Sequence, residues 1–168
     1  MSSPSSPNPH AASPAEWFAR DTREGRNGSA AGGLRFQCTM CGNCCSGPPG
    51  YVLVTPEESA RLAARLGLSI ARFERAYTSL TREGRSLVEK KSPHGLDCVF
   101  LDREKIPGRA VCGVYEDRPA QCRTWPYWPS LLRSERAWVA AKKTCPGIDH
   151  GPLIPPERIR ILRDTIDI

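Results

Sequence analysis

Residues 37–47 read QCTMCGNCCSG, and this stretch places four cysteines within eight consecutive residues. The first three follow the spacing C-x₂-C-x₂-C and the fourth comes directly after them: Cys38, Cys41, Cys44 and Cys45. Two residues between cysteines allow a tight turn to aim both sulfurs at one centre, and Gly42 supplies the backbone freedom that such a turn needs. A single C-x₂-C pair fits zinc, iron–sulfur or redox chemistry, whereas three cysteines in this register are typical of metal ligands.

Cys45 directly follows Cys44, and neighbouring side chains diverge where the backbone is extended. We therefore expect that the two thiols do not both bind one mononuclear ion. Cys45 then binds a second centre, belongs to a polynuclear centre, or is a buried packing thiol.

Four more cysteines are far from this run and from each other: Cys98, Cys112, Cys122 and Cys145. They can join the run only if the chain folds back onto it, so a shared site would cross-link the whole domain. Eight thiols in total could complete two four-thiolate sites, or one cluster plus spare or redox-active thiols.

The compartment decides how clustered cysteines are used. The first twenty residues contain neither the basic segment nor the apolar segment of a secretory signal, which predicts a cytoplasmic protein. No apolar run approaches the roughly 20 residues that cross a bilayer, so we expect no membrane association. Cytoplasmic thiols are kept reduced, which favours metal ligands or redox groups over structural disulfides.

Composition divides the chain into two parts. Residues 1–33 are dominated by Ser, Pro, Ala, Gly and Asn, so we expect a disordered tail in which only Trp17 and Phe18 could form a short anchoring turn. Residues 34–168 are expected to form one cysteine-cluster domain. Its predicted fold class is α+β: a small, metal-stabilised domain with short strands, two to three helices and long cysteine-bearing loops.

Three helices are predicted from capping signals and apolar spacing. The first spans residues 56–66, with Thr55 and Glu58 as a capping box and Gly67 at its end. The second spans residues 70–80, with apolar side chains at Ile70, Phe73 and Tyr77 after a Ser69 cap. The third begins at Pro156 and buries Ile159, Leu162 and Ile166.

Strands are predicted at residues 51–55, 86–91 and 136–141. Residues 96–116 are expected to form a hairpin with Cys98 on its first strand and Cys112 on its second. The proline-rich residues 118–129 predict an ordered loop or a short turn of helix.

Other residues could assist the cysteines. His94 and His150 each lie near a cysteine and are weaker candidate ligands, whereas His10 belongs to the tail. Asp97 could bind the metal, support a ligand or shape a turn. Arg118 and Arg123 flank Cys122, where they could donate hydrogen bonds to ligand sulfurs and offset their negative charge, or form surface ion pairs.

Four blocks of sequence together resemble the YkgJ family, also described as the CxxCxxCC family of zinc- or iron-chelating proteins: FQCTMCGNCC, VLVTPEESARLAARLGL, DCVFL and CGVYEDRPAQCRTWPYW. The resemblance runs from Phe36 to Trp128, and to Cys145 if TCPG is the closing element. The family often has Phe where this chain has Trp125. A related cysteine arrangement occurs in flagellin lysine methylation proteins, which gives iron equal standing with zinc. The resemblance implies metal binding by Cys38, Cys41, Cys44, Cys45, Cys98, Cys112, Cys122 and Cys145.

The leading hypothesis is a protein that chelates zinc or an iron–sulfur centre through the CxxCxxCC cluster and the later cysteines. A first alternative is an oxidoreductase or transferase component that uses iron–sulfur or thiol chemistry, so whether the protein is an enzyme stays open. A second is a nucleic-acid-binding zinc module, suggested by the net charge of +6 and by the rings of Trp125, Tyr127 and Trp128. A proline-braced aromatic core is the preferred use of those rings, and the sequence indicates no particular protein partner.

Overall fold

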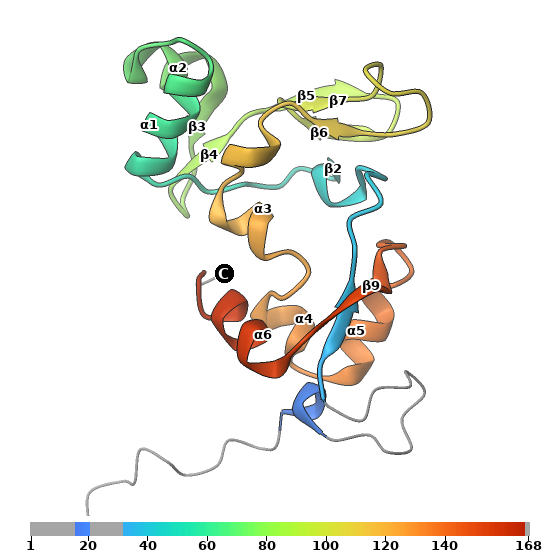
Figure 1. Ribbon diagram of the computed structural model, residues 1–168. Coiled ribbons are helices and arrows are strands. Elements are labelled where there is room, and N and C mark those ends of the chain that lie inside the picture. The colour runs from blue at the N-terminus through green and yellow to red at the C-terminus, as the bar shows by residue number, and fades with distance from the viewer. Residues whose placement is uncertain (1–15, 21–31, 167–168) are drawn as a thin grey trace, which may run out of the picture.

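The computed structural model describes residues 16–20 and 32–166, and it is an α+β protein whose elements form two groups (Figure 1). The upper group contains α1 (Pro56–Arg65), α2 (Ile70–Tyr77), β2 (Ser46–Gly47), β3 (Thr78–Leu80), β4 (Arg85–Leu87), β5 (Glu89–Ser92), β6 (Gly95–Cys98), β7 (Leu101–Asp102) and β8 (Val111–Cys112). The lower group contains the 3-10 helix η1 (Trp17–Ala19), β1 (Leu34–Phe36), α4 (Pro129–Leu132), α5 (Glu135–Ala141), β9 (Ile148–Ile154) and α6 (Pro156–Arg163). The short helices η2 (Asn43–Cys45), beside β2, and η3 (Tyr115–Asp117), against α1, belong to the upper group, and α3 (Ala120–Thr124) lies between the two groups. The helices outnumber the two to three expected.

The first two helices begin as their sequence predicts. The Thr55 hydroxyl accepts a hydrogen bond from the Glu58 backbone N–H, while the Glu58 carboxylate accepts one from the Thr55 N–H. Gly67 then ends the helix with a positive φ of 65°. The second helix stops at Tyr77 rather than at residue 80, because the next three residues pair with β4 instead. Its first apolar residue, Ile70, is 49% exposed, contrary to the expected buried stripe.

The strands form four small antiparallel sheets: β1–β9, β2–β6–β5, β3–β4 and β7–β8. The hairpin predicted for residues 96–116 is only partly correct. Cys112 pairs with Leu101, but Cys98 pairs with Glu89 in a different sheet. The reason is that β6 returns along β5 through a tight turn, and the chain then bends at residues 99–100 before β7 begins.

The strand predicted at residues 136–141 is wrong, because α5 occupies this segment. The Ser134 hydroxyl accepts the Ala137 N–H and so caps the helix, and the alanines of RAWVAA favour helix over strand. Trp138 and Ala141, three residues apart, are buried on one face. The strand expected at residues 51–55 contributes only one bridge, between Leu53 and Ser86.

The remaining predicted strand, residues 86–91, is divided at Val88 between β4 and β5. At the other end of the chain, α6 begins at Pro156 as expected and buries Ile159. It ends at Arg163, so Ile166 follows the helix instead of extending its buried face.

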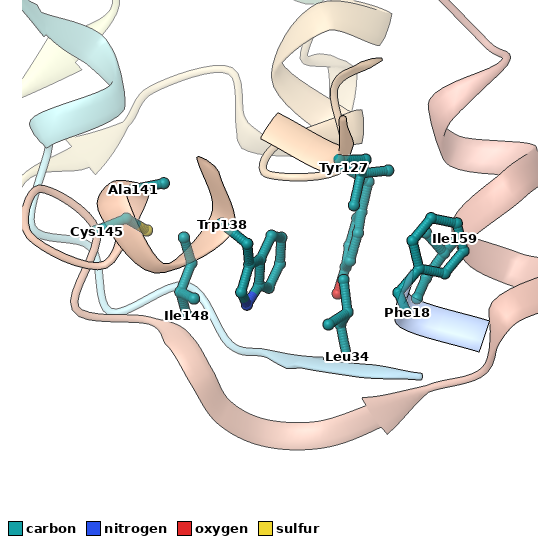
Figure 2. Close-up of a cluster of buried hydrophobic side chains, with 9 residues drawn as sticks. Phe18, Leu34, Tyr127, Trp138, Ala141, Cys145, Ile148 and Ile159 are labelled. Atoms are coloured by element: carbon teal, nitrogen blue, oxygen red, sulfur yellow. The ribbon is translucent and has the colours of Figure 1, made fainter. Parts of the chain in front are cut away.

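Each group of elements has its own hydrophobic core. The lower one, here called the Trp138 core, packs Trp138 against Tyr127 with ring centroids 5.9 Å apart and includes Leu34 and Ile148 (Figure 2). The upper one, here called the Phe73 core, is built from the following residues: Val54, Leu62, Ala63, Phe73, Leu87, Phe100 and Val114. The described part of the chain therefore has two separate cores.

Part of the segment expected to be a tail packs on the Trp138 core. Phe18 is buried in that core, and the Trp17 indole N–H donates to the Leu132 carbonyl at 2.8 Å. The Glu16 carboxylate accepts hydrogen bonds from Arg160 and Arg163 on α6. The rest of the expected tail, residues 1–15 and 21–31, lies outside the described residues. No helix in the described part of the chain is long and apolar enough to span a membrane.

Candidate metal centre

A cavity of about 130 Å³ lies between the two cores, and its wall takes side chains from both. Trp125, which packs on the Trp138 core, lines one part, and Phe100 and Val114 from the Phe73 core line another. All eight cysteines of the chain also line it: Cys38, Cys41, Cys44, Cys45, Cys98, Cys112, Cys122 and Cys145. The fold thus brings thiols that are up to 107 positions apart in sequence to one cavity.

The loop that carries the first four cysteines is shaped by Gly42, whose φ is 79°. Its carbonyl accepts the Cys45 N–H and the Ser46 hydroxyl, both at 2.9 Å, which closes the short helix η2. A Cβ at position 42 would lie 2.6 Å from the Ala110 Cβ, so only glycine fits. The Ala110 N–H in turn donates to the Met40 carbonyl at 2.8 Å and holds the loop against the upper group.

Cys44 and Cys45 do not diverge as the sequence predicts, because the backbone between them is a 3-10 turn rather than an extended strand. Their Sγ atoms lie 3.7 Å apart. Two sulfurs of one tetrahedral zinc site with bonds near 2.3 Å are separated by about 3.8 Å. The separation of the two thiols therefore suits two ligands of a single ion.

The same pair differs in acidity. The hydrogen bond shared with Cys45 lowers the pKa of Cys44 to about 7, and Arg118 adds to this effect. That hydrogen bond and burial raise the pKa of Cys45. The Cys44 side chain is exposed, so a partly ionised thiol is accessible at the mouth of the cavity near neutral pH.

The four later cysteines come from four different elements. Cys98 ends β6, Cys112 lies on β8, Cys122 on α3, and Cys145 follows α5 inside the Trp138 core, where Figure 2 shows its sulfur beside Ala141 and Ile148. Burial raises the pKa of Cys98 to about 11 and raises that of Cys112 and Cys122 as well. These thiols hold their protons at neutral pH unless a metal displaces them.

Backbone pairing explains why Cys145 lies near the cysteine loop. Strand β1, just before the loop, pairs with β9, just after Cys145. The Asn43 side chain then donates to the Thr144 carbonyl at 2.7 Å. In the other direction, the Gln121 side chain on α3 bonds to the backbone of Tyr51 and Leu53, which places Cys122 opposite the loop.

A second cavity, also of about 130 Å³, adjoins the first. Three cysteines line both cavities, namely Cys44, Cys45 and Cys98, and Glu89 contributes to the second alone. The space around the adjacent cysteines is therefore larger than one ion requires.

The donors fit a thiophilic metal. All eight cysteines are free of disulfides, and thiolates are the preferred ligands of zinc and of iron–sulfur clusters. Within residues 16–20 and 32–166, no three Cys, His, Asp or Glu side chains already stand in the arrangement of a complete metal site. The eight cysteines thus line one cavity, but their sulfurs do not converge on a single point.

The other candidate residues differ in whether they line the cavity. Arg118 lines the cavity, with its guanidinium carbon 3.6 Å from the centre of the Tyr115 ring. Arg123 does not line it: this side chain donates to the Arg118 carbonyl and lies 3.8 Å from the Glu58 carboxylate. The two histidines expected near cysteines, His94 and His150, are likewise not among the lining residues, and His10 lies outside the described residues.

An ion pair between Asp97 and Arg103 lies beside the cysteine loop, and only Asp97 was a candidate residue in the sequence. Asp97, considered there as a ligand, supporting or turn residue, is 2% exposed and accepts two hydrogen bonds from Arg103, at 2.8 and 3.0 Å. Arg103 also donates to the Ser46 hydroxyl at 2.6 Å, and hydrogen bonding to this guanidinium holds the pKa of Asp97 well below its usual range. Nothing in the sequence around Arg103 distinguishes it from a surface arginine.

Of the aromatic residues proposed as stacking groups for nucleic acid, Tyr127 is buried, whereas Trp125 and Trp128 are half-buried and line the cavity. Tyr127 is 3% exposed in the Trp138 core, and Trp125 contacts Trp128 edge to face at 4.8 Å. The Trp128 N–H donates to the Gln121 carbonyl. This arrangement agrees with the preferred interpretation of a proline-braced aromatic core.

Comparison with known proteins gives one family match. The family model described as "CxxCxxCC: Putative zinc- or iron-chelating domain" matches residues 37–146, which include all eight cysteines. No solved structure matches the chain.

Proposed function

The chain belongs to the CxxCxxCC family, whose description is metal chelation, and on this premise we propose that its cysteines bind zinc or an iron–sulfur centre in the cavity between the two cores. The observation that supports the proposal most directly is that all eight thiols line one cavity, although they come from five separate parts of the chain. Packing alone has no need to gather every cysteine of a protein at one place.

The residues have distinct parts in this proposal. Cys44 and Cys45, 3.7 Å apart, form a preset pair, and the lowered pKa of Cys44 favours the ionised ligand. The half-buried thiols of Cys98, on β6, and Cys122, on α3, add further ligands, and Arg118 offsets part of the negative charge. Eight thiols exceed the four ligands of one zinc ion, so more than one metal ion or a polynuclear cluster is the proposed occupant.

When bound, zinc would supply a structural or Lewis-acid centre, and an iron–sulfur cluster would supply electron transfer. Both need reduced thiols, and we propose a cytoplasmic location for that reason.

A second candidate function is thiol-dependent or iron–sulfur redox chemistry, as in an oxidoreductase or transferase component. The Cys44 thiol favours it, because the hydrogen bond with Cys45 lowers the pKa of Cys44 to about 7, so this exposed thiol is partly ionised at neutral pH.

A single protein preparation distinguishes the two candidate functions. Protein purified without oxygen is examined by ultraviolet–visible spectroscopy and elemental analysis. A colourless protein with stoichiometric zinc supports the chelating function, whereas iron, sulfide and a chromophore that bleaches on reduction support the redox function. Protein with neither metal, before or after reconstitution with Zn²⁺ or with iron and sulfide, contradicts the proposal.

Substituting one thiol tests the role of the cysteines. Cys41→Ser should lower metal content and also reduce the free energy of unfolding, because bound metal stabilises the folded state. Met40→Leu is the matched control, since it alters the same loop and the same cavity wall but retains every thiol. If Cys41→Ser keeps full metal content and normal stability, Cys41 is not a ligand.

A further inference from the structure

Three buried side-chain polar atoms in the described part of the chain have no hydrogen-bond partner: Ser59 Oγ, Trp125 Nε1 and Tyr127 Oη. Leaving such an atom unpaired is unfavourable, because it has lost its hydrogen bond to water without gaining another. Of the three residues, only Trp125 lines the thiol cavity. Among the described residues that line the candidate metal centre, Trp125 therefore carries the one buried side-chain donor without a partner.

The other tryptophans show that the fold normally provides an acceptor. Trp17 donates to the Leu132 carbonyl at 2.8 Å, Trp128 to the Gln121 carbonyl at 2.9 Å and Trp138 to the Asp149 carboxylate at 2.9 Å. Trp125 is the single exception among the four tryptophans of the chain. Its ring is nevertheless firmly placed, edge to face against Trp128 and packed on the Trp138 core.

The cavity contains a suitable class of acceptor. Its wall is mostly apolar apart from the thiols, and Trp125 follows Cys122 by three residues at the end of α3. A neutral thiol is a weak acceptor, but a thiolate bound to a metal, or the sulfide of a cluster, carries negative charge and accepts N–H groups well.

We propose that the Trp125 indole N–H donates a hydrogen bond to a sulfur of the metal centre that the cavity binds. This inference rests on the proposed function and deepens it by assigning a residue that tunes the centre without binding metal. The hydrogen bond stabilises negative charge on the sulfur, so it favours the metal-bound thiolate over the free, protonated thiol and, in an iron–sulfur centre, raises the reduction potential.

The test compares two tryptophan variants with the wild type, using Zn²⁺ and Co²⁺ as probes. Trp125→Phe keeps an aromatic ring and removes the N–H, and we expect it to bind Zn²⁺ about tenfold more weakly in competition with a chromophoric chelator. The sulfur-to-Co²⁺ charge-transfer band should also move to lower energy, because the sulfur regains electron density. A defect in packing alone would not move this band.

Trp17→Phe is the matched control. It makes the same change away from the cavity wall and removes a hydrogen bond that ends on the Leu132 backbone carbonyl. We expect its Zn²⁺ affinity to stay within about twofold of the wild type and its charge-transfer band to stay in place. If Trp125→Phe behaves like this control, the inference is wrong.

A measurement on the unmodified protein avoids reliance on any variant. In ¹H–¹⁵N spectra of the tryptophan indoles, one N–H resonance should move downfield and exchange more slowly when Zn²⁺ is added, and it should be absent from Trp125→Phe. An indole spectrum unchanged by bound Zn²⁺ would overturn the inference but leave metal binding intact. Failure of the wild type to bind either probe would instead overturn the proposed function, and this inference with it.

Discussion

At the scale of single residues, the site depends on local conformations that bring polar groups closer than sequence spacing suggests. The 3-10 turn after Gly42 sets Cys44 and Cys45 at a distance suited to one metal ion. Behind this loop, the buried Asp97 carboxylate binds Arg103, which also bonds to Ser46. The ion pair thus supports the residue that immediately follows the two cysteines.

Arg103→Met should destabilise the protein by about 3 kcal/mol, because it leaves the Asp97 carboxylate buried without a partner. The free energy of unfolding from urea titration measures the effect. Arg109→Met, an exposed site in the same segment, is the control and should change little. Adding Asp97→Asn to the first variant should restore part of the stability, and a stability of Arg103→Met equal to the control would contradict the assigned role.

At the scale of elements, α3 is held in place by side chains from outside it. Glu58, on α1, accepts the Thr55 N–H with one oxygen and the Ala120 N–H, at the start of α3, with the other at 2.7 Å. One carboxylate therefore serves the beginnings of two helices. Since α3 carries Cys122, the capping box of α1 is linked to the candidate metal centre.

Replacing each of the two members of this capping box should have a different effect on stability and on metal affinity. Thr55→Ala removes a cap from α1 only and should cost about 1 kcal/mol of unfolding free energy without changing metal affinity. Glu58→Ala also leaves the Ala120 N–H unpaired and should cost roughly 2–3 kcal/mol. It should weaken Zn²⁺ binding as well, as chelator competition would measure. Equal effects of both variants on metal affinity would show that Glu58 does not position α3.

At the scale of the whole molecule, the thiol cavity lies where the two cores meet. Cys145 belongs to the Trp138 core, whereas Cys98 and Cys112 pack against the Phe73 core. Figure 1 shows the upper and lower groups connected there mainly by α3 and by the segment that carries the first cysteines. A metal bound by thiols from both sides would cross-link the two cores.

Metal removal should therefore loosen the junction before it unfolds either core. With a chelator present, hydrogen–deuterium exchange should quicken first in residues 37–47 and 118–128, while α1 and α5 keep most of their protection. The metal-loaded protein is the reference, and re-addition of Zn²⁺ should restore slow exchange. Uniform loss of protection throughout the described residues would instead mean that the metal stabilises one cooperative unit.

The sequence by itself determined the helix ends that depend on residues close together in the chain. The capping box of α1, the glycine after it, the cap of α2 and the start of α6 all follow from side chains within four positions of one another. The α+β class and the family also follow, because they depend on cysteine spacing and on local patterns.

Only the tertiary structure decided the rest. The helix over RAWVAA has a local cap at Ser134, but its apolar pattern is ambiguous until Trp138 and Ala141 pack in the Trp138 core. Cys98 and Cys112 enter different sheets because the apolar pattern does not specify which strands pair. Arg103 bonds to Ser46, which is 57 positions away, and Trp125 reaches the cavity wall only when the chain folds. Local sequence fixes conformation over a few residues, whereas the meeting of eight thiols between two cores depends on how the whole chain packs.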